Sequence, residues 1–370
     1  MPRAPANNTL IPLLRKLSEK LGEQQAKNEL RWMVDHVHAT LDDTRRPHSD
    51  KGPRHTARLW RDQPARSPME IEQDGIRFRP VQWAWLRQAV AERTEKHKPL
   101  QYILGDQPFG QAKIAVRPPV LIPRWETEEW MLRLSDMLST HVARARDAEA
   151  PVSGRDAVSM QQPLRILDAC TGSGCVALGM ACALPEGSAS ITGVDISDEA
   201  LALAGENLAL NSMLAKNKVD FLGLDIQSPE AAARLQGVSP RWDMIVANPP
   251  YVTPSEYSEI DPDVREWEDI RALVPLPPGA DPAKVPLGEL DPSGVAFIVR
   301  LAKLAQEMGL SDPRGPSAAG TALPRIVVEI GGEKQVEPVC QAMHDHGLNS
   351  TEVWKDMAGS ERVVLGYLKV

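Results

Sequence analysis

The 370-residue sequence has no long hydrophobic run and only four cysteines. No stretch approaches 18 uninterrupted apolar residues, so the sequence predicts no membrane-spanning helix. The cysteines show no paired metal spacing, and because no His/Cys cluster is present we expect no zinc or other metal site. Cys175 and Cys182 stand seven residues apart in an apolar segment, so we expect them to be buried free thiols in a reducing compartment.

Positive charge is scarce over most of the chain. Residues 1–98 carry 19 Lys and Arg against 13 Asp and Glu, whereas residues 99–370 carry 23 against 37, a net charge of −14. A surface this acidic is a poor scaffold for a phosphate backbone and a better one for a basic protein partner. The alternative is that the surface acids only keep the domain soluble. We expect no direct nucleic-acid substrate.

The most informative motif is Asn248-Pro249-Pro250-Tyr251, which ends the apolar run 243–247. Two prolines fix φ and remove two donors, so the nearby acceptors stay free for a planar group that carries an NH₂. The Asn248 side-chain oxygen and the Pro249 carbonyl can each accept one N–H, and Tyr251 offers a ring face. The motif favours methyl transfer to a planar nitrogen; the alternative is a turn that merely uses helix-breaking residues.

Upstream, an apolar strand over 164–169 leads into a glycine-rich turn, Cys170-Thr171-Gly172-Ser173-Gly174, and then an apolar helix. Glycines let backbone N–H groups approach a ligand closely, and the helix N-terminus adds a partial positive charge. Twenty-one residues after Gly174, the strand 191–195 ends in Asp195, which is placed to accept both ribose hydroxyls of a bound adenosine. This pattern is typical of a nucleotide-type site in an α/β sheet.

The glycine spacing alone is ambiguous, because Gly172-x-Gly174-x-x-Ala177 also satisfies a dinucleotide fingerprint. Asp168 favours S-adenosylmethionine, because the ammonium group of that cofactor needs an anionic or carbonyl-rich neighbour. Asp225-Ile226 follows the third strand, where we expect contacts to the adenine ring. Each acid has the alternative of being only a helix cap. The predicted catalytic residues are Asn248, Pro249, Pro250 and Tyr251, and the predicted cofactor-binding residues are Asp168, Cys170, Thr171, Gly172, Ser173, Gly174, Asp195, Asp225, Ile226 and Asn248.

These motifs resemble those of the HemK/PrmC family of release factor glutamine methyltransferases, over nearly the whole chain. Further segments that look like the family's are 99–105, 109–110, 120–128, 291–297, 328–331 and 356–364. Three positions depart from the family pattern. Trp125 replaces a second proline, Ser293 is inserted at a helix start, and Glu268-Asp269 replaces Glu-Pro.

The resemblance implies an α/β class I S-adenosylmethionine-dependent methyltransferase, with a Rossmann-like seven-stranded sheet and a small helical N-terminal domain. The implied reaction is methylation of the glutamine side-chain amide nitrogen in the Gly-Gly-Gln motif of a class I peptide chain release factor. The implied organisation is a substrate-recognition domain over 1–98, a hairpin linker over 99–122 and a catalytic domain over 123–370. We expect a monomer.

The main alternative is an adenine-N6 methyltransferase acting on DNA or RNA, which uses the same Asn-Pro-Pro-Tyr geometry. That activity would call for a basic groove or a base-flipping domain, and the catalytic part is acidic. A catalytically silent cofactor-binding subunit and a nicotinamide dehydrogenase fit less well, because neither explains the intact motif. Residues 28–32 look like the start of the N-terminal domain in fungal mitochondrial members. Residues 1–18 are compatible with a presequence or with a first bundle helix, so we expect a mitochondrial location, otherwise a cytoplasmic one.

Hydrophobic periodicity predicts helices over 10–21, 26–41, 81–96 and 126–145. It predicts strands over 164–169, 191–195, 219–224, 242–247, 325–330, 351–354 and 363–368. Polar or Pro/Gly/Ser-rich segments predict insertions over 42–68, 146–162, 275–292 and 311–324, the first two of them mobile.

Overall fold

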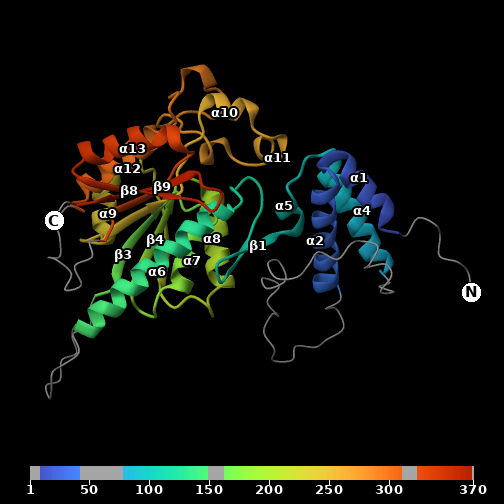
Figure 1. Ribbon diagram of the computed structural model, residues 1–370, viewed down its shortest axis with the longest axis horizontal. Helices are drawn as coiled ribbons and strands as arrows, with labels where there is room; N and C mark the ends of the chain where they lie inside the picture. Colours follow the sequence, from blue (N-terminus) through green and yellow to red (C-terminus); the bar gives the residue numbers. More distant parts are fainter. Residues whose placement is uncertain (1–8, 42–77, 149–161, 311–322, 369–370) are drawn as a thin grey trace, which may run out of the picture. The chain divides into compact units, whose positions relative to one another are not determined.

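The computed structural model describes residues 9–41, 78–148, 162–310 and 323–368. The chain divides into two compact units, coloured along the sequence in Figure 1. One unit contains the chain up to Gln107 together with Asp261–Trp267, and the other contains Pro108–Ile260 and Glu268–Val370. No helix in the described ranges is long and apolar enough to cross a membrane.

The expected insertion over 42–68 lies outside the described residues, as do 149–161 and 311–322, which make up most of two others. The expected insertion over 275–292 is described. It forms part of the long connection between strands β6 and β7, which contains α10 (Pro254–Glu259), α11 (Pro262–Arg265), η3 (Ile270–Ala272) and η4 (Leu287–Glu289).

The first unit is a small helical bundle. Its main helices are α1 (Ile11–Leu21), α2 (Glu23–Leu41), α4 (Pro80–Glu95) and α5 (Leu100–Leu104). The three helices expected before residue 98 are therefore confirmed. Leu17, Leu30 and Leu86 are fully buried where α1, α2 and α4 pack together, which explains the apolar spacing along each helix.

A buried ion group holds α11 in this bundle. Arg93 donates from Nε and Nη2 to the two oxygens of Glu29, at 2.8 and 3.1 Å, and from Nη1 to Asp263 at 2.7 Å. Arg93 and Glu29 are each 4% exposed, so either charge would be costly without the other. The Trp267 indole donates to the backbone at the end of α4, at 2.9 Å. The segment 261–267 is thus built into the helical unit, although it follows the Asn-Pro-Pro-Tyr motif in the sequence.

The second unit is built on a seven-stranded sheet. Its strands are β3 (Leu164–Ala169), β4 (Ala189–Asp195), β5 (Lys218–Gly223), β6 (Met244–Ala247), β7 (Ile326–Glu329), β8 (Ser350–Lys355) and β9 (Glu361–Tyr367). The strand order is β5-β4-β3-β6-β7-β9-β8, with β9 antiparallel to both of its neighbours and the remaining pairs parallel. All seven expected strands are confirmed.

Helices cover the sheet in two groups (Figure 1). One group is α6 (Trp125–Ala148), α7 (Cys175–Ala183) and α8 (Asp198–Leu210), and the other is α9 (Ala231–Val238), α12 (Ala296–Glu307) and α13 (Glu333–Asp345). The expected end of α6 at 145 was wrong, because residues 146–148 continue the helix. These three residues contain no helix breaker, and the first proline stands at 151.

A two-stranded hairpin, β1 (Asp106–Phe109) and β2 (Ala112–Ala115), precedes this fold. Two asparagines one turn apart, one on α8 and the other at its C-cap, bind the free edge of β2. Asn207 exchanges hydrogen bonds with the backbone of Ala115, and Asn211 does so with that of Lys113, at 2.8–3.1 Å. Because each amide both donates and accepts, it replaces a neighbouring strand.

The order in which successive strands are added reverses between β3 and β6, and that point positions the site. The register pairs Ala169 with Ala247, so the glycine-rich turn and the Asn-Pro-Pro-Tyr motif leave the sheet side by side. On the other side of β6, Ala247 pairs with Val328, so Asn248 and Glu329 also follow paired residues. Residues far apart in the sequence therefore meet at one edge of the sheet.

Candidate active site

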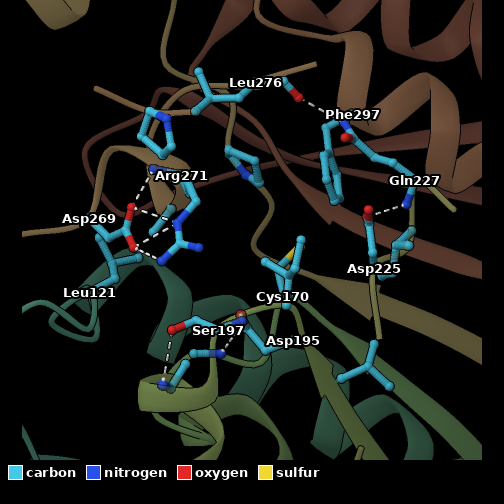
Figure 2. Close-up of a pocket in the computed structure, with 18 of the residues that line it drawn as sticks. Leu121, Cys170, Asp195, Ser197, Asp225, Gln227, Asp269, Arg271, Leu276 and Phe297 are labelled. Atoms are coloured by element: carbon cyan, nitrogen blue, oxygen red, sulfur yellow. Dashed lines mark hydrogen bonds and ion pairs between the residues drawn. The ribbon is translucent and has the colours of Figure 1, made fainter. Parts of the chain in front are cut away.

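A pocket opens at this edge, and Figure 2 shows the side chains around it. Seven of the predicted site residues line it, namely Cys170, Gly172, Asp195, Asp225, Ile226, Asn248 and Pro250. Six do not line it, namely Asp168, Thr171, Ser173, Gly174, Pro249 and Tyr251. The assignment of all these residues to cofactor or catalysis stays a prediction, and the contacts below say what each is placed to do.

The glycine-rich turn is packed tightly against β4. Gly172 and Gly174 have positive φ angles of 53° and 79°, a conformation that glycine adopts without strain. A Cβ on Gly193 would lie 2.6 Å from both Thr171 Oγ1 and the Phe221 ring. Glycine in the middle of β4 therefore lets the turn approach the strand that carries Asp195.

Asp168 lies beneath this turn. Its Oδ2 accepts hydrogen bonds from Thr171 Oγ1 at 2.6 Å and from the Ala177 N–H at 3.1 Å. The residue is 1% exposed, and burial raises the pKa of its carboxyl to about 7. These contacts give Asp168 a direct role in shaping the turn and the start of α7.

Asp195 joins the turn to the start of α8. Its Oδ2 accepts from the Gly172 N–H at 2.9 Å and its Oδ1 accepts from the Ser197 N–H at 3.0 Å. Asp225 similarly accepts from the Gln227 N–H at 2.8 Å. These bonds to nearby backbone N–H groups fit the alternative role of the two acids as caps. Both carboxylates also face the pocket, however, and each oxygen can still accept another hydrogen bond.

The pocket has the charge expected for a cationic ligand. Burial raises the pKa of the Cys170 thiol well above its usual range, and the neighbouring carboxylates Asp195, Asp168 and Asp225 add to that rise. Asp195 and Asp225, which line the pocket, favour a positively charged group. Apolar side chains such as Ile226 complete the wall, so the lining fits S-adenosylmethionine, which combines an adenosine with a sulfonium and an ammonium.

The free thiols expected at Cys175 and Cys182 are confirmed, since both cysteines are buried and unpaired. Burial raises the pKa of Cys175 to about 12, so this thiol stays protonated at neutral pH. Among the described residues, no group of three or more His, Cys, Asp or Glu side chains could hold a metal ion.

Sequence reasoning missed the opposite rim of the pocket. The Asp269 carboxylate binds the Arg271 guanidinium at 2.6–3.1 Å, and both residues face the cavity (Figure 2). The Asp269 N–H also donates to the Pro119 carbonyl at 2.9 Å. A proline at 269 could not make that bond, so the departure at Glu268-Asp269 has a structural consequence. The acid-x-base spacing of Asp269 and Arg271 was the available signal.

The side-chain amide of Asn248 is bound through its nitrogen, and its oxygen is left without a hydrogen bond among the described residues. Its Nδ2 donates to Thr127 Oγ1 at 2.9 Å, and the Thr127 hydroxyl donates to Glu329 Oε2 at 2.7 Å. Among the described residues, no donor bonds to Asn248 Oδ1. The carboxylate of Glu329 also accepts from Trp130 Nε1 at 2.7 Å and from the Tyr251 hydroxyl at 2.9 Å.

The Tyr251 backbone is anchored as well. Gln335 Nε2 donates to the Tyr251 and Ser293 carbonyls, each at 2.9 Å, and Gln335 Oε1 accepts from the Gly331 N–H at 2.7 Å. Thr127 and Glu329 lie in two of the segments that resemble the family, yet no role was predicted for either residue. Nothing in the local pattern links them to the Asn-Pro-Pro-Tyr motif.

The strand order, the single antiparallel strand and the position of the pocket define a class I S-adenosylmethionine-dependent methyltransferase fold. Residues 157–260 match the family model of the methyltransferase small domain. The chain is 33% identical over 209 residues to the probable MRF1 mitochondrial N(5)-glutamine methyltransferase of Schizosaccharomyces pombe, covering 55% of this chain and 58% of that protein. It is 32% identical over 280 residues to the release factor glutamine methyltransferase of Thermodesulfovibrio yellowstonii, covering 75% and 79%.

The chain belongs to the release factor glutamine methyltransferase family. It spans a little over half the length of the fission yeast relative, 58%. Among solved structures, the hMettl16 catalytic domain in complex with MAT2A 3′UTR hairpin 6 is similar at a TM-score of 0.42 and 12% identity, over 79% of this chain and 84% of that one. A similarity that distant carries no inference about substrate.

Proposed function

We propose that this chain methylates the side-chain amide nitrogen of the glutamine in the Gly-Gly-Gln motif of a class I peptide chain release factor. The orientation of Asn248 carries the proposal, because its Nδ2 is bound to Thr127 and its Oδ1 is left to accept a substrate N–H. Asn248 also lines the pocket that fits the cofactor. The bacterial relative is named a release factor glutamine methyltransferase and the fission yeast relative an MRF1 N(5)-glutamine methyltransferase, and both names support the choice of substrate.

The cofactor site combines the residues that face the pocket. S-adenosylmethionine supplies, when bound, a methyl group on a positively charged sulfur. Asp195 would accept the ribose hydroxyls on its remaining lone pairs, and Asp225 and Ile226 would border the adenine. Cys170 and Gly172 also line the pocket. The other predicted residues of the turn, together with Asp168, act by holding its shape.

The substrate amide requires precise orientation because its nitrogen lone pair is delocalised into the carbonyl. Asn248 Oδ1 and the Pro249 carbonyl accept one N–H each, so the lone pair is turned toward the cofactor side of the pocket. Tyr251 packs near the amide plane, and Pro250 closes the wall. Orientation and exclusion of water supply most of the acceleration. The proton leaves to water after transfer, when the nitrogen has become acidic, so no dedicated base is required.

The helical unit and the hairpin segment are proposed to recognise a whole folded factor. The net charge of −14 over residues 99–370 favours the approach of a basic partner. We expect a short peptide containing Gly-Gly-Gln to be methylated with a far lower kcat/KM than the intact factor. Equal kcat/KM values for the two substrates would contradict this part of the proposal.

A mitochondrial location is proposed from the fission yeast relative, whose name includes the organelle. The test is fractionation of cells that carry the tagged full-length chain at its natural level, with matrix and cytosolic marker proteins followed in parallel. Recovery with the cytosolic markers alone would overturn the location and leave the reaction untouched.

The reaction is tested with isotopically labelled S-adenosylmethionine and intact release factors, using fragment mass spectrometry to locate the methyl group. We expect label on the Gly-Gly-Gln glutamine. Asn248→Ala should abolish turnover with cofactor affinity nearly unchanged, and Asn248→Asp should also fail. Asn349→Ala, at an exposed asparagine of the same unit, is the matched control. Label on adenine of added DNA or RNA, or an Asn248→Ala enzyme with most of its kcat, would refute the proposal.

A further inference from the structure

Glu329 is a buried carboxylate with three hydrogen-bond donors and no assigned role. It ends β7, is 1% exposed, and accepts from Thr127 Oγ1, Trp130 Nε1 and the Tyr251 hydroxyl at 2.7, 2.7 and 2.9 Å. Burial raises the pKa of Glu329, whereas the three donors and the nearby Arg362 favour the ionised form. A buried carboxylate needs such donors, and here one belongs to the Asn-Pro-Pro-Tyr motif and another, Thr127, contacts Asn248.

The direction of each bond follows from the chemistry of the groups. Glu329 Oε2 accepts from Thr127 Oγ1, so the single Thr127 proton is used toward Glu329. The Thr127 oxygen is then left to accept, and the donor that Asn248 can offer is its NH₂. The Asn248 amide is therefore fixed with Nδ2 toward Thr127 and Oδ1 away from it.

Fixing this amide matters because its two orientations have almost the same shape. Rotated by half a turn, Asn248 would present its NH₂ to the NH₂ of a substrate amide, and the two donors would repel. The packing of Pro249 and Pro250 restrains the backbone but does not distinguish the two side-chain orientations. The choice requires a partner of defined hydrogen-bond direction.

The same carboxylate reaches the other end of the motif. Its Oε1 accepts from the Tyr251 hydroxyl, while Gln335 holds the Tyr251 backbone carbonyl. Asn248 and Tyr251 thus depend on one buried group, one through a hydroxyl and one directly. The register of β6 with β7 brings that group alongside the motif.

We propose that Glu329 is a positioning residue that, through the Thr127 hydroxyl, determines which way the Asn248 amide faces and, through the phenol, holds Tyr251. This inference rests on the proposed function, because it concerns the acceptor that orients the substrate amide. Trp130 is the third donor to Glu329, and among the described residues it makes no hydrogen bond to Asn248. Replacing Trp130 therefore removes a bond that stabilises Glu329 without removing the bond that orients the Asn248 amide.

The first test is Thr127→Val, which keeps the shape of the side chain and removes both bonds of its hydroxyl. We expect kcat to fall about 10- to 100-fold, since one misplaced acceptor disturbs the geometry of attack. The calorimetric affinity for S-adenosylmethionine should stay within about twofold, and Thr127→Ser should restore most of the kcat. Thr140→Val is the matched control, because Thr140 lies on the same helix and bonds only to an exposed carbonyl.

The second test distinguishes the connection from Glu329 to Asn248 through Thr127 from the direct connection of Glu329 to Tyr251. Glu329→Gln can keep an oxygen toward Thr127 and Trp130 and place its NH₂ against Tyr251, so we expect a smaller loss of kcat than for Thr127→Val. That loss should match the loss of Tyr251→Phe, and the double variant should be no worse than either single one. Trp130→Phe should lower the melting temperature and leave kcat within about threefold of the wild type.

These outcomes separate the inference from the proposed function. If the wild-type chain does not methylate a release factor, the proposed function fails. If the wild type is active and Thr127→Val retains its kcat, the positioning role of Glu329 is overturned and the function stands. A Thr127→Val chain that loses kcat together with cofactor affinity, and that Thr127→Ser does not rescue, also overturns it, because the defect is then one of folding.

Discussion

The substitution Asp195→Asn tests whether the Asp195 carboxylate has a structural role, a ligand-binding role, or both. The two oxygens of Asp195 serve different partners, the Gly172 N–H through Oδ2 and the Ser197 N–H through Oδ1. Asparagine has one acceptor oxygen, so it can satisfy only one of these N–H groups and turns its own NH₂ toward the other. The substitution keeps the volume of the side chain and changes its charge and its hydrogen-bonding pattern.

The expected magnitude follows from the bonds lost. One charge-assisted bond to a backbone N–H is removed, which should lower the free energy of unfolding by about 1.5–3 kcal/mol. If both ribose hydroxyls bind this carboxylate, the affinity for S-adenosylmethionine should fall by a similar free energy, or about 10- to 150-fold. Asp195→Ala should lower it at least as much.

The assays are denaturant unfolding for stability and titration calorimetry for the cofactor. Asp198→Asn is the matched control, because Asp198 is an exposed acid in the first turn of α8 and should change either quantity by less than about 1 kcal/mol. Unchanged cofactor affinity in Asp195→Asn would show that Asp195 only closes the turn. Lower affinity at unchanged stability would refute the structural half of the reasoning.

Three further predictions concern the same edge of the sheet. Cys170 has a φ of +59°, so Cys170→Gly should relieve backbone strain and raise the free energy of denaturant unfolding by about 0.5–1 kcal/mol. Gly193→Ala would place a methyl group 2.6 Å from Thr171 Oγ1, so it should lower the free energy of unfolding by about 1–3 kcal/mol and weaken cofactor binding in calorimetry. The pKa of Asp168 is raised to about 7, so the folded state holds a proton that the unfolded state, with a pKa of about 4, has lost. The stability contributed by this group is present below about pH 4 and is lost as the pH rises to about 7, and unfolding of Asp168→Asn across that range should lack the decline.

Most elements of the fold were predictable because their signals are local. Strand β3 was predicted with the bounds that it has, since its apolar run ends in a turn with two glycines. The end of α6 was misplaced because the residues after 145 are compatible with both helix and loop. The pocket-facing positions of Asp195 and Asn248 were also predictable, because each follows a strand and carries the chemistry that a ligand needs.

By itself the sequence determined the class of fold, the glycine-rich turn and the Asn-Pro-Pro-Tyr motif, because each rests on residues that are adjacent in the chain. Only the tertiary structure decided which groups act on them. Thr127 meets Asn248 across 121 residues and Glu329 across 202, and no periodicity marks such a pair. These contacts depend on the sheet register and on the packing of α6, which are set by burial of the whole core. The same long-range packing makes the Asp168 carboxyl hard to ionise, because water is excluded from it only in the folded chain.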